Sequence, residues 1–412
     1  MQAPASGAGK GLPPRDGGGP LTAFFTAPSL AWGPGAVEQL SGLGARRAAV
    51  VVDPAVAGRE GPLRAVEELE KAGATTELIG ELRHPQRVAN VGELAERLRR
   101  FGPDWIVAIG GGATLDAAKA ARLWLEQPEL PLDPPPSVVP FPEVPTSHLV
   151  AIPTTSGSGA EASWTCDLLA GNGSPVELAH RALVPDWALL DPAFAQGLPP
   201  AELRSGGLAT AAVAAEAYVS AWSNPFSDAL AVGALTAVAR NLSPALKWTD
   251  EPEARAALYY AATMAGLAAS NAQRGVAHAL ARALEGPSGV AYGTLLGLVV
   301  PTVLDFDRPA AREKLEALSW ALATPEEPSH PDLPSRLRRL ATSVGAPRDL
   351  AQAGAPIAEL RSRRAELLAA AMRSPGTVAN PRVPTAEDLA GLLDQLLGST
   401  PASGGSRLPA SR

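Results

Sequence analysis

The sequence contains a single cysteine, Cys166, among 412 residues. One thiol cannot build a disulfide framework or a cysteine-based zinc site, so both are excluded. The absence of disulfides fits a reducing cytoplasm, which is where we expect the protein to be located.

Positive charge and long apolar runs are also limited. The 35 Lys and Arg residues are outnumbered by 42 Asp and Glu residues, for a net charge of -7, which argues against a nucleic-acid binder with a basic face. The first 20 residues lack the apolar segment of a secretory signal. The longest uncharged stretch, residues 286–304, contains two prolines, so we interpret it as a buried core helix rather than a membrane span. Neither nucleic acid nor a membrane is an expected partner.

Glycine and proline are abundant, with 40 and 41 residues. Together they make about a fifth of the chain, below the roughly 25–30% typical of low-complexity proteins. We therefore predict disorder only in two tails, residues 1–20 and 399–412. Between the tails the composition changes once, near residue 200, which predicts one domain over residues 21–200 and a second over residues 201–398.

The first domain alternates short β-branched runs with helical patterns, which predicts a parallel sheet covered by helices on both faces. Strands are expected at 48–53, 75–79, 105–109 and 149–153, and helices at 63–72, 91–101 and 113–126. Residues 127–145 are too rich in proline for a helix, and we interpret them as a surface excursion.

The second domain has no convincing strand and is rich in alanine and leucine. Helices are expected at 206–221, 226–241, 252–271, 275–284, 290–304, 310–322, 333–343, 357–372 and 385–397. Many are apolar all round, which is typical of helices that pack on one another. The predicted fold class is an α/β domain with a parallel sheet, followed by an all-α domain.

A glycine-rich turn, Gly110-Gly111-Gly112, follows the strand at 105–109 and opens a helix. Glycines at such a turn let backbone N–H groups approach a phosphate, and the helix N-terminus adds partial positive charge. Asp53 ends another strand, where a carboxylate accepts hydrogen bonds from ribose hydroxyls and repels the 2′-phosphate of NADP. Together they indicate a dinucleotide-binding domain with NAD preferred over NADP. The alternatives are tight packing for the glycines and a turn starter for Asp53.

A second turn, IPTTSGSGAE at 152–161, also follows a strand. Thr154, Thr155 and Ser158 supply hydroxyls and amides that suit a diphosphate or a nicotinamide carboxamide. The alternative is a polar loop whose serines cap a helix.

GGGATLDAAK at 110–119 and IPTTSGSGAE at 152–161 resemble the iron-containing alcohol dehydrogenase family, within the dehydroquinate-synthase-like fold. Further markers follow in the family's order: PDWALLDP at 185–192, EAYVS at 216–220 and NPFSDA at 224–229. The resemblance extends from about residue 22 to 395. It implies a dinucleotide-binding α/β domain, an all-helical domain, a nicotinamide-dependent dehydrogenase with its active site between them, and by analogy a homodimer.

The resemblance also implies a divalent metal, usually iron or zinc, held by one Asp and three His and acting as a Lewis acid. The corresponding positions are Ala209, Val213, His278 and Tyr292. Neither Ala nor Val can coordinate, and one imidazole cannot hold a catalytic divalent ion. The other four histidines of the chain lie outside the motif. The sequence therefore predicts no metal at the family position. The alternative is a water-ligated ion held by His278 and a carboxylate that the sequence does not identify.

Hydride transfer without a metal needs a proton donor near the substrate oxygen. His278 and Tyr292 are the catalytic candidates for this general-acid role, and packing residues are the alternative for both. Arg282 replaces a second His that the family often carries. It is a candidate to bind an anionic substrate group, or else a solvated helix residue. Asp116 is expected to line the cofactor cleft, or else to balance the helix dipole.

Two functions remain. The first is an NAD(P)-dependent oxidoreductase that interconverts a small alcohol with an aldehyde or ketone, without the family metal. The second is a catalytically inactive relative that keeps the fold and acts as a binding or interaction protein. The intact cofactor motifs favour the first, and the missing metal ligands favour the second. We adopt the first as the working hypothesis and assign no role to Cys166.

Overall fold

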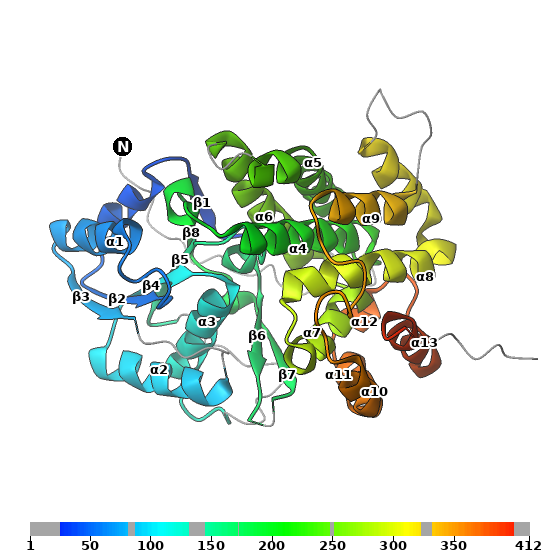
Figure 1. The fold of residues 1–412 in the computed structure, drawn as a ribbon. Helices are drawn as coiled ribbons and strands as arrows, with labels where there is room; N and C mark the ends of the chain where they lie inside the picture. The colour runs from blue at the N-terminus through cyan, green and yellow to red at the C-terminus, as the bar shows by residue number, and fades with distance from the viewer. Residues whose placement is uncertain are drawn as a thin grey trace, which may run out of the picture.

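The computed structural model describes residues 25–80, 87–131, 145–171, 173–247, 251–322 and 332–398. The two predicted tails and most of the proline-rich excursion lie outside these residues. Figure 1 shows a sheet-containing half that is followed along the chain by a helical half, with the two packed side by side.

The larger sheet has six parallel strands in the order β1-β8-β5-β4-β2-β3. The strands are β1 (Ser29–Trp32), β2 (Arg47–Val52), β3 (Thr75–Ile79), β4 (Trp105–Gly110), β5 (His148–Pro153) and β8 (Trp187–Leu190). Three of the predicted strands, β2, β4 and β5, lie inside this sheet, where both faces are buried, and the fourth, β3, lies at its edge. The predicted parallel sheet is confirmed, whereas the sequence prediction missed the two four-residue strands β1 and β8.

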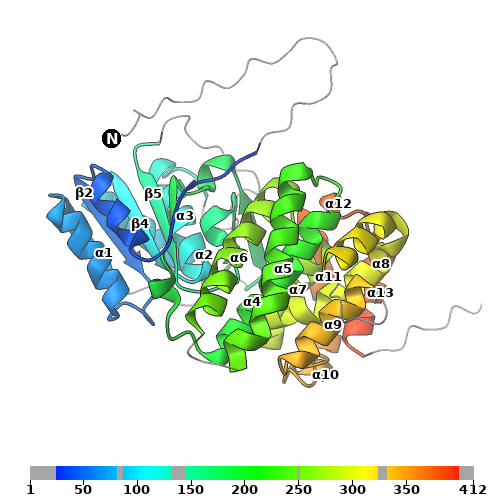
Figure 2. The same cartoon turned by 90° about the horizontal axis from the view of Figure 1, so that it is seen from above.

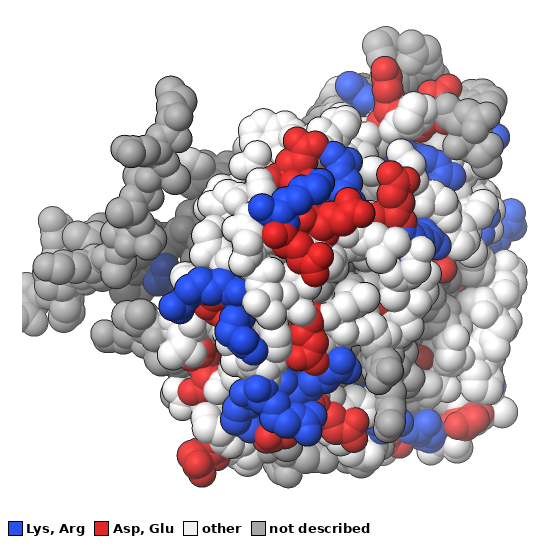
Figure 3. Space-filling model, turned by 90° about the vertical axis from the view of Figure 1, so that its left-hand side faces the viewer, with Lys and Arg blue, Asp and Glu red and all other residues white. Residues whose placement is uncertain are grey.

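Helices cover both faces of the sheet (Figure 2). The helices α2 (Val88–Phe101) and α3 (Gly112–Glu126) pack on one face, and α1 (Glu60–Lys71) packs on the other. Each face has its own apolar cluster, as expected for a sheet with a helical layer on each side. The face of the molecule in Figure 3 shows acidic and basic side chains next to one another.

A separate antiparallel hairpin, β6 (Thr165–Leu169) and β7 (Pro175–Ala179), was not predicted from the sequence. Successive side chains along each strand point to opposite faces of the hairpin. Cys166 and Leu178 face the apolar cluster under α3, and the next cross-strand pair, Asp167 and Glu177, lies on the opposite face. Two carboxylates directly opposite each other repel, so this pair needs a cation from elsewhere in the fold.

The second half of the described chain is helical, which confirms the predicted all-α domain. Its helices are α4 (Pro200–Val219), α5 (Pro225–Lys247), α6 (Pro252–Ala272), α7 (Val276–Ser288), α8 (Tyr292–Ala321), α9 (Leu333–Ser343), α10 (Ile357–Ser362), α11 (Arg364–Met372), α12 (Gly376–Ala379) and α13 (Ala386–Leu396). Several boundaries differ from the prediction: α4 begins six residues earlier than expected, α5 ends six residues later, and α12 was not predicted. The helices expected at 290–304 and 310–322 are one helix with a kink at Ala311, and the one expected at 357–372 breaks at Arg363.

The uncharged stretch 286–304 is not one continuous helix. The helix α7 ends at Ser288, Gly289 adopts a left-handed conformation with φ of 67°, and α8 begins at Tyr292. Among the described helices, α5 is the one that is long and apolar enough to cross a membrane by length and composition. In this fold α5 packs against α4 and α6.

The turn after β5 joins the two halves through contacts between glycines. A Cβ built on Gly157 would lie 2.5 Å from the Cα of Gly206 in α4, and one built on Gly159 would lie 2.5 Å from the Cα of Gly266 in α6. No side chain fits at such distances. The turn that carries Thr154, Thr155 and Ser158 is therefore held directly against the helical domain.

We predict that Gly206→Val loosens this contact, because its side chain would overlap the carbonyl oxygen of Ser156. Overpacking of this kind costs about 1–3 kcal/mol, so the denaturation midpoint should fall and any dinucleotide should bind more weakly. The control is Gly391→Ala on α13, where no atom lies near the added Cβ. An unchanged midpoint for Gly206→Val would contradict the packing described here.

Candidate functional site

The glycine turn lies between β4 and α3. Gly111 is the N-cap of α3 in an extended conformation, and no side chain caps the helix. A Cβ on Gly110 would lie 2.6 Å from the Cβ of Thr114, and one on Gly112 would lie 2.6 Å from the Cβ of Ser158. The turn is therefore too tight for larger residues, and the uncapped N–H groups of the first turn of α3 suit a phosphate.

The other predicted cofactor residues gather around this turn. Asp53 follows β2, and its Oδ2 accepts a hydrogen bond of 3.2 Å from the hydroxyl of Thr114. Thr154 donates its backbone N–H to the carbonyl of Gly110 at 3.0 Å. Thr155 lies beside Gly111, with its Cγ2 3.3 Å from where a Cβ would be. The carboxyl ends of β2, β4 and β5 are neighbours in the sheet, which is where open α/β sheets bind ligands.

Asp116 has different contacts from these residues. It is buried with Lys119, whose Nζ lies 3.2 Å away. Its Oδ2 accepts a hydrogen bond of 3.1 Å from the backbone N–H of Asp167. Burial raises the pKa of Asp116, and the charge of Lys119 opposes that rise. These contacts fasten β6 to α3, and a cofactor-lining role for Asp116 stays a prediction.

The two catalytic candidates lie in contact. His278 is buried in the first turn of α7, and Tyr292 is the first residue of α8. The Nδ1 of His278 lies 2.5 Å from the Oη of Tyr292. On its other side, the Nε2 of His278 lies 3.5 Å from an oxygen of Glu177 and 4.0 Å from one of Asp167.

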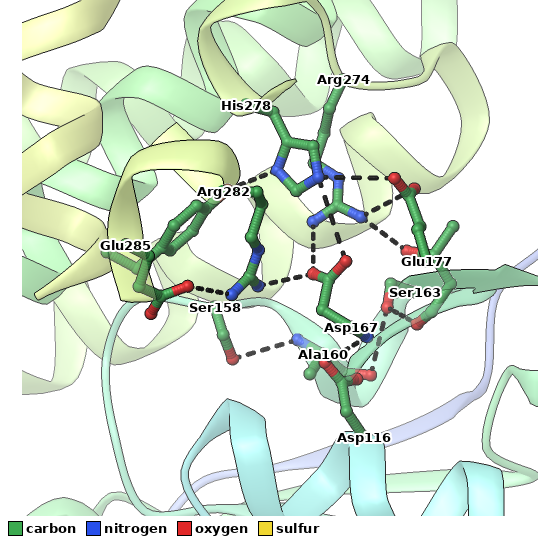
Figure 4. Close-up of polar contacts among 12 residues, drawn as sticks. Asp116, Ser158, Ala160, Ser163, Asp167, Glu177, Arg274, His278, Arg282 and Glu285 are labelled. Carbon is green, nitrogen blue, oxygen red and sulfur yellow. Dashed lines mark hydrogen bonds and ion pairs between the residues drawn. The ribbon is translucent and has the colours of Figure 1, made fainter. Parts of the chain in front are cut away.

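Two arginines complete this group, as Figure 4 shows. Arg274, in the turn before α7, lies 3.2 Å from Asp167 and 3.2 Å from Glu177. Arg282 lies 2.5 Å from Asp167 and 2.7 Å from Glu285, and its guanidinium stacks 4.0 Å above the ring of Tyr292. We predicted Arg282 to be an anion ligand or a solvated residue. The structure instead pairs it with carboxylates of this chain.

The charges fix the protonation state of His278. Burial would raise the pKa of Asp167, but Arg282 and Arg274 outweigh burial and lower it. The pKa of Glu177 is also lowered, because Arg274 and His278 outweigh burial there. Burial and the charge of Arg274 lower the pKa of His278, so its imidazole is neutral at pH 7. Carboxylates only accept hydrogen bonds, so Nε2 carries the proton and Nδ1 accepts the hydroxyl of Tyr292.

Glu216 holds the start of α7 in place. Its Oε1 accepts the backbone N–H of Ala277 at 2.8 Å and that of His278 at 3.4 Å. Its Oε2 has no hydrogen-bond partner among the described residues. Burial, with the nearby charge of Asp307, raises the pKa of Glu216 to about 7. This carboxyl group thus positions the turn that carries His278.

The family's metal does not fit the four positions that the resemblance assigns to it. Ala209 and Val213 are each 4% exposed and belong to the apolar core of the helical domain. Tyr292 is engaged with His278. A different trio, Asp167, Glu177 and His278, offers ligand atoms that lie within 4.8 Å of one another, but both carboxylates are already paired with arginines. The expectation that no divalent metal is bound stays a prediction.

Four features of the site were not predicted from the sequence: Asp167, Glu177, Arg274 and the positioning role of Glu216. One local signal pointed to the hairpin: the pair Asn172-Gly173 separates two short runs, TCDLL and PVELA, in which polar and apolar residues alternate. No local signal identified Arg274, because its carboxylate partners lie about a hundred residues earlier in the chain.

Two family models match nearly the whole described chain. Residues 28–192 match the model of iron-containing alcohol dehydrogenase, and residues 205–397 match the C-terminal model of the Fe-containing alcohol dehydrogenase family.

Curated relatives and solved structures agree with the family models. The probable alcohol dehydrogenase EutG of Escherichia coli is 32% identical over 308 residues, which cover 74% of this chain and 76% of that protein. An NADPH-dependent butanol dehydrogenase of Clostridium saccharobutylicum is 31% identical and covers 70% of this chain and 75% of its own length. The iron-containing alcohol dehydrogenase of Thermococcus thioreducens superposes with a TM-score of 0.83 at 27% identity, covering 92% of this chain and 100% of that one. The chain therefore belongs to the iron-containing alcohol dehydrogenase family of NAD(P)-dependent oxidoreductases.

Proposed function

We propose that the protein interconverts a small alcohol with its aldehyde or ketone, with NAD(H) as the coenzyme, and that Tyr292 and His278 transfer the proton without the family's metal. The contact between His278 Nδ1 and Tyr292 Oη, at 2.5 Å, carries this proposal. It brings two proton-transferring groups together at two of the positions that the resemblance assigns to metal ligands. We also propose that the enzyme works in the cytoplasm.

The residues around the glycine turn fit a dinucleotide. The backbone of Gly110, Gly111 and Gly112 and the uncapped start of α3 would hold the diphosphate. Asp53 would accept the ribose hydroxyls, and its charge disfavours a 2′-phosphate. Thr154, Thr155 and Ser158 would surround the nicotinamide end. NAD, when bound, supplies the hydride acceptor or donor.

The proton path follows from the protonation states. During alcohol oxidation Tyr292 Oη takes the substrate's hydroxyl proton as its own proton passes to Nδ1 of His278. The imidazolium that forms keeps its Nε2 proton directed at Glu177 and Asp167, whose negative charges stabilise it. In the reductive direction the same protons move back, and Tyr292 delivers one to the carbonyl oxygen.

Arg282 stacks on the ring of Tyr292 and so limits the orientations of the phenol. Its paired state argues against a strongly anionic substrate, because Asp167 and Glu285 already take up its charge. The favoured substrate is therefore a neutral small alcohol or carbonyl compound.

We predict that Tyr292→Phe and His278→Ala each lower kcat by about 10²–10⁴-fold, because each removes general acid–base catalysis. The double variant should lose little more than either single variant, since the two groups act as one relay. Activity would be measured with NADH on a panel of aldehydes and with NAD on the matching alcohols. Tyr218→Phe is the control, because Tyr218 lies on α4 and contacts Lys314. Undiminished turnover in both single variants would refute the relay.

We predict that Asp53→Ala raises kcat/KM with NADPH relative to NADH by about tenfold, because the repulsion of the 2′-phosphate is removed. Glu96→Gln removes a carboxylate from the surface of α2 and should leave the ratio unchanged. Coenzyme binding by fluorescence gives a second measurement that needs no substrate. Equal preference for both coenzymes in the unaltered enzyme would contradict the role of Asp53.

A further inference from the structure

The trio Asp167, Glu177 and His278 has the arrangement of a cation site. Each carboxylate directs one oxygen at an arginine and the other at His278. Asp167 Oδ2 and Glu177 Oε1 meet guanidinium nitrogens, whereas Asp167 Oδ1 and Glu177 Oε2 lie 4.0 and 3.5 Å from His278 Nε2. Ligand atoms bonded to a tetrahedral zinc ion at about 2.0–2.2 Å lie roughly 3.3–3.6 Å apart. Small side-chain movements would therefore bring the three groups onto one ion.

The charge balance explains why an ion is disfavoured while both arginines are in place. Asp167 and Glu177 carry two negative charges, and Arg274 and Arg282 carry two positive charges, beside a neutral imidazole. Even when Glu285, which pairs with Arg282, is counted, a divalent ion would leave one uncompensated positive charge beside two guanidinium groups in a largely buried site, which is unfavourable. Without the guanidinium groups the same site would carry the two negative charges that a divalent ion neutralises.

Both arginines are held in position by the fold. Arg282 is stacked on Tyr292. Arg274 follows Gln273, the one non-glycine residue with positive φ in the described chain, at φ 66° and ψ 158°. Residues other than glycine rarely adopt this strained conformation, and it persists only where surrounding contacts impose it. The turn directs Arg274 between the two hairpin carboxylates.

We infer that Arg274 and Arg282 act as built-in counter-ions that close a latent divalent-cation site formed by Asp167, Glu177 and His278. The inference deepens the metal-free part of the proposed function. Replacing the two arginines with neutral residues opens the site to a tetrahedral transition-metal ion such as Zn²⁺ or Co²⁺.

The test measures cobalt binding, which gives visible absorption bands on tetrahedral coordination. Wild type, dialysed against chelator and then exposed to Co²⁺, should show no stoichiometric binding. Arg274→Gln/Arg282→Gln should bind about one equivalent per chain, and Zn²⁺ should displace it. Adding His278→Ala to this double variant should abolish the bands. Arg274→Lys/Arg282→Lys, which keeps both charges, should behave like wild type.

Folding of the double variant is followed separately by thermal unfolding with and without Zn²⁺. Because a ligand that binds only the native state stabilises it, Zn²⁺ should raise the Tm of the glutamine variant and leave that of wild type unchanged. If the double variant does not fold, Arg282→Gln alone decides the question. Arg282 is the more exposed of the two arginines, and its loss should tighten Co²⁺ binding on the order of tenfold.

One bound equivalent in wild type would overturn the inference, as would a folded glutamine variant that binds no more Co²⁺ than wild type. Failure of the proposed function can be distinguished from failure of this inference, because cobalt absorption and Tm do not depend on turnover. If wild type shows no activity but gives the predicted cobalt results, the proton relay is refuted and the counter-ion role of the arginines is not.

Discussion

The pairing of hairpin carboxylates with arginines from the helical domain is the interaction on which the site depends. Asp167 and Glu177 are direct cross-strand neighbours, an arrangement that repulsion alone would disfavour. Arg274 reaches both, and Arg282 reaches one. The hairpin belongs to the first domain and both arginines to the second. These ion pairs therefore also join the sheet-containing half of the chain to the helical half.

The protonation state of His278 and its hydrogen bond with Tyr292 follow from that pairing. Because the carboxylates remain ionised, they hold the Nε2 proton of His278, and this leaves Nδ1 to accept the hydroxyl of Tyr292. Glu216 and Asn380 satisfy the backbone N–H groups at the start of α7, so the imidazole enters the site from a fixed turn. A change in either set of contacts would therefore alter the hydrogen bond between His278 and the phenol of Tyr292.

The helical core accounts for the apolar residues at the positions of the missing ligands. Ala209 and Val213 pack among other alanines and leucines of α4 and its neighbours. An unpaired carboxylate or imidazole at these positions would be costly to bury. At the glycine turn, by contrast, a side chain on Gly110 or Gly112 would collide with Thr114 or Ser158, so the backbone can approach this closely only without side chains. The two sides of the site thus obey different constraints, close backbone approach on one and apolar packing on the other.

The sequence by itself determined the parallel sheet, the helical second half and the glycine turn with Asp53 and Thr154. Long β-branched runs, alanine-rich helical patterns and turn glycines are local signals that do not need tertiary context. It did not determine the strands β1 and β8, because four residues are too few to show the alternation that identifies a strand. The ion cluster was decided only by the tertiary structure. Arg274 and Asp167 are 107 residues apart in the chain, and a long-range ion pair leaves no periodicity. The sequence placed His278 and Tyr292 among the candidates, but only folding put Nδ1 and Oη in contact and surrounded them with balanced charge.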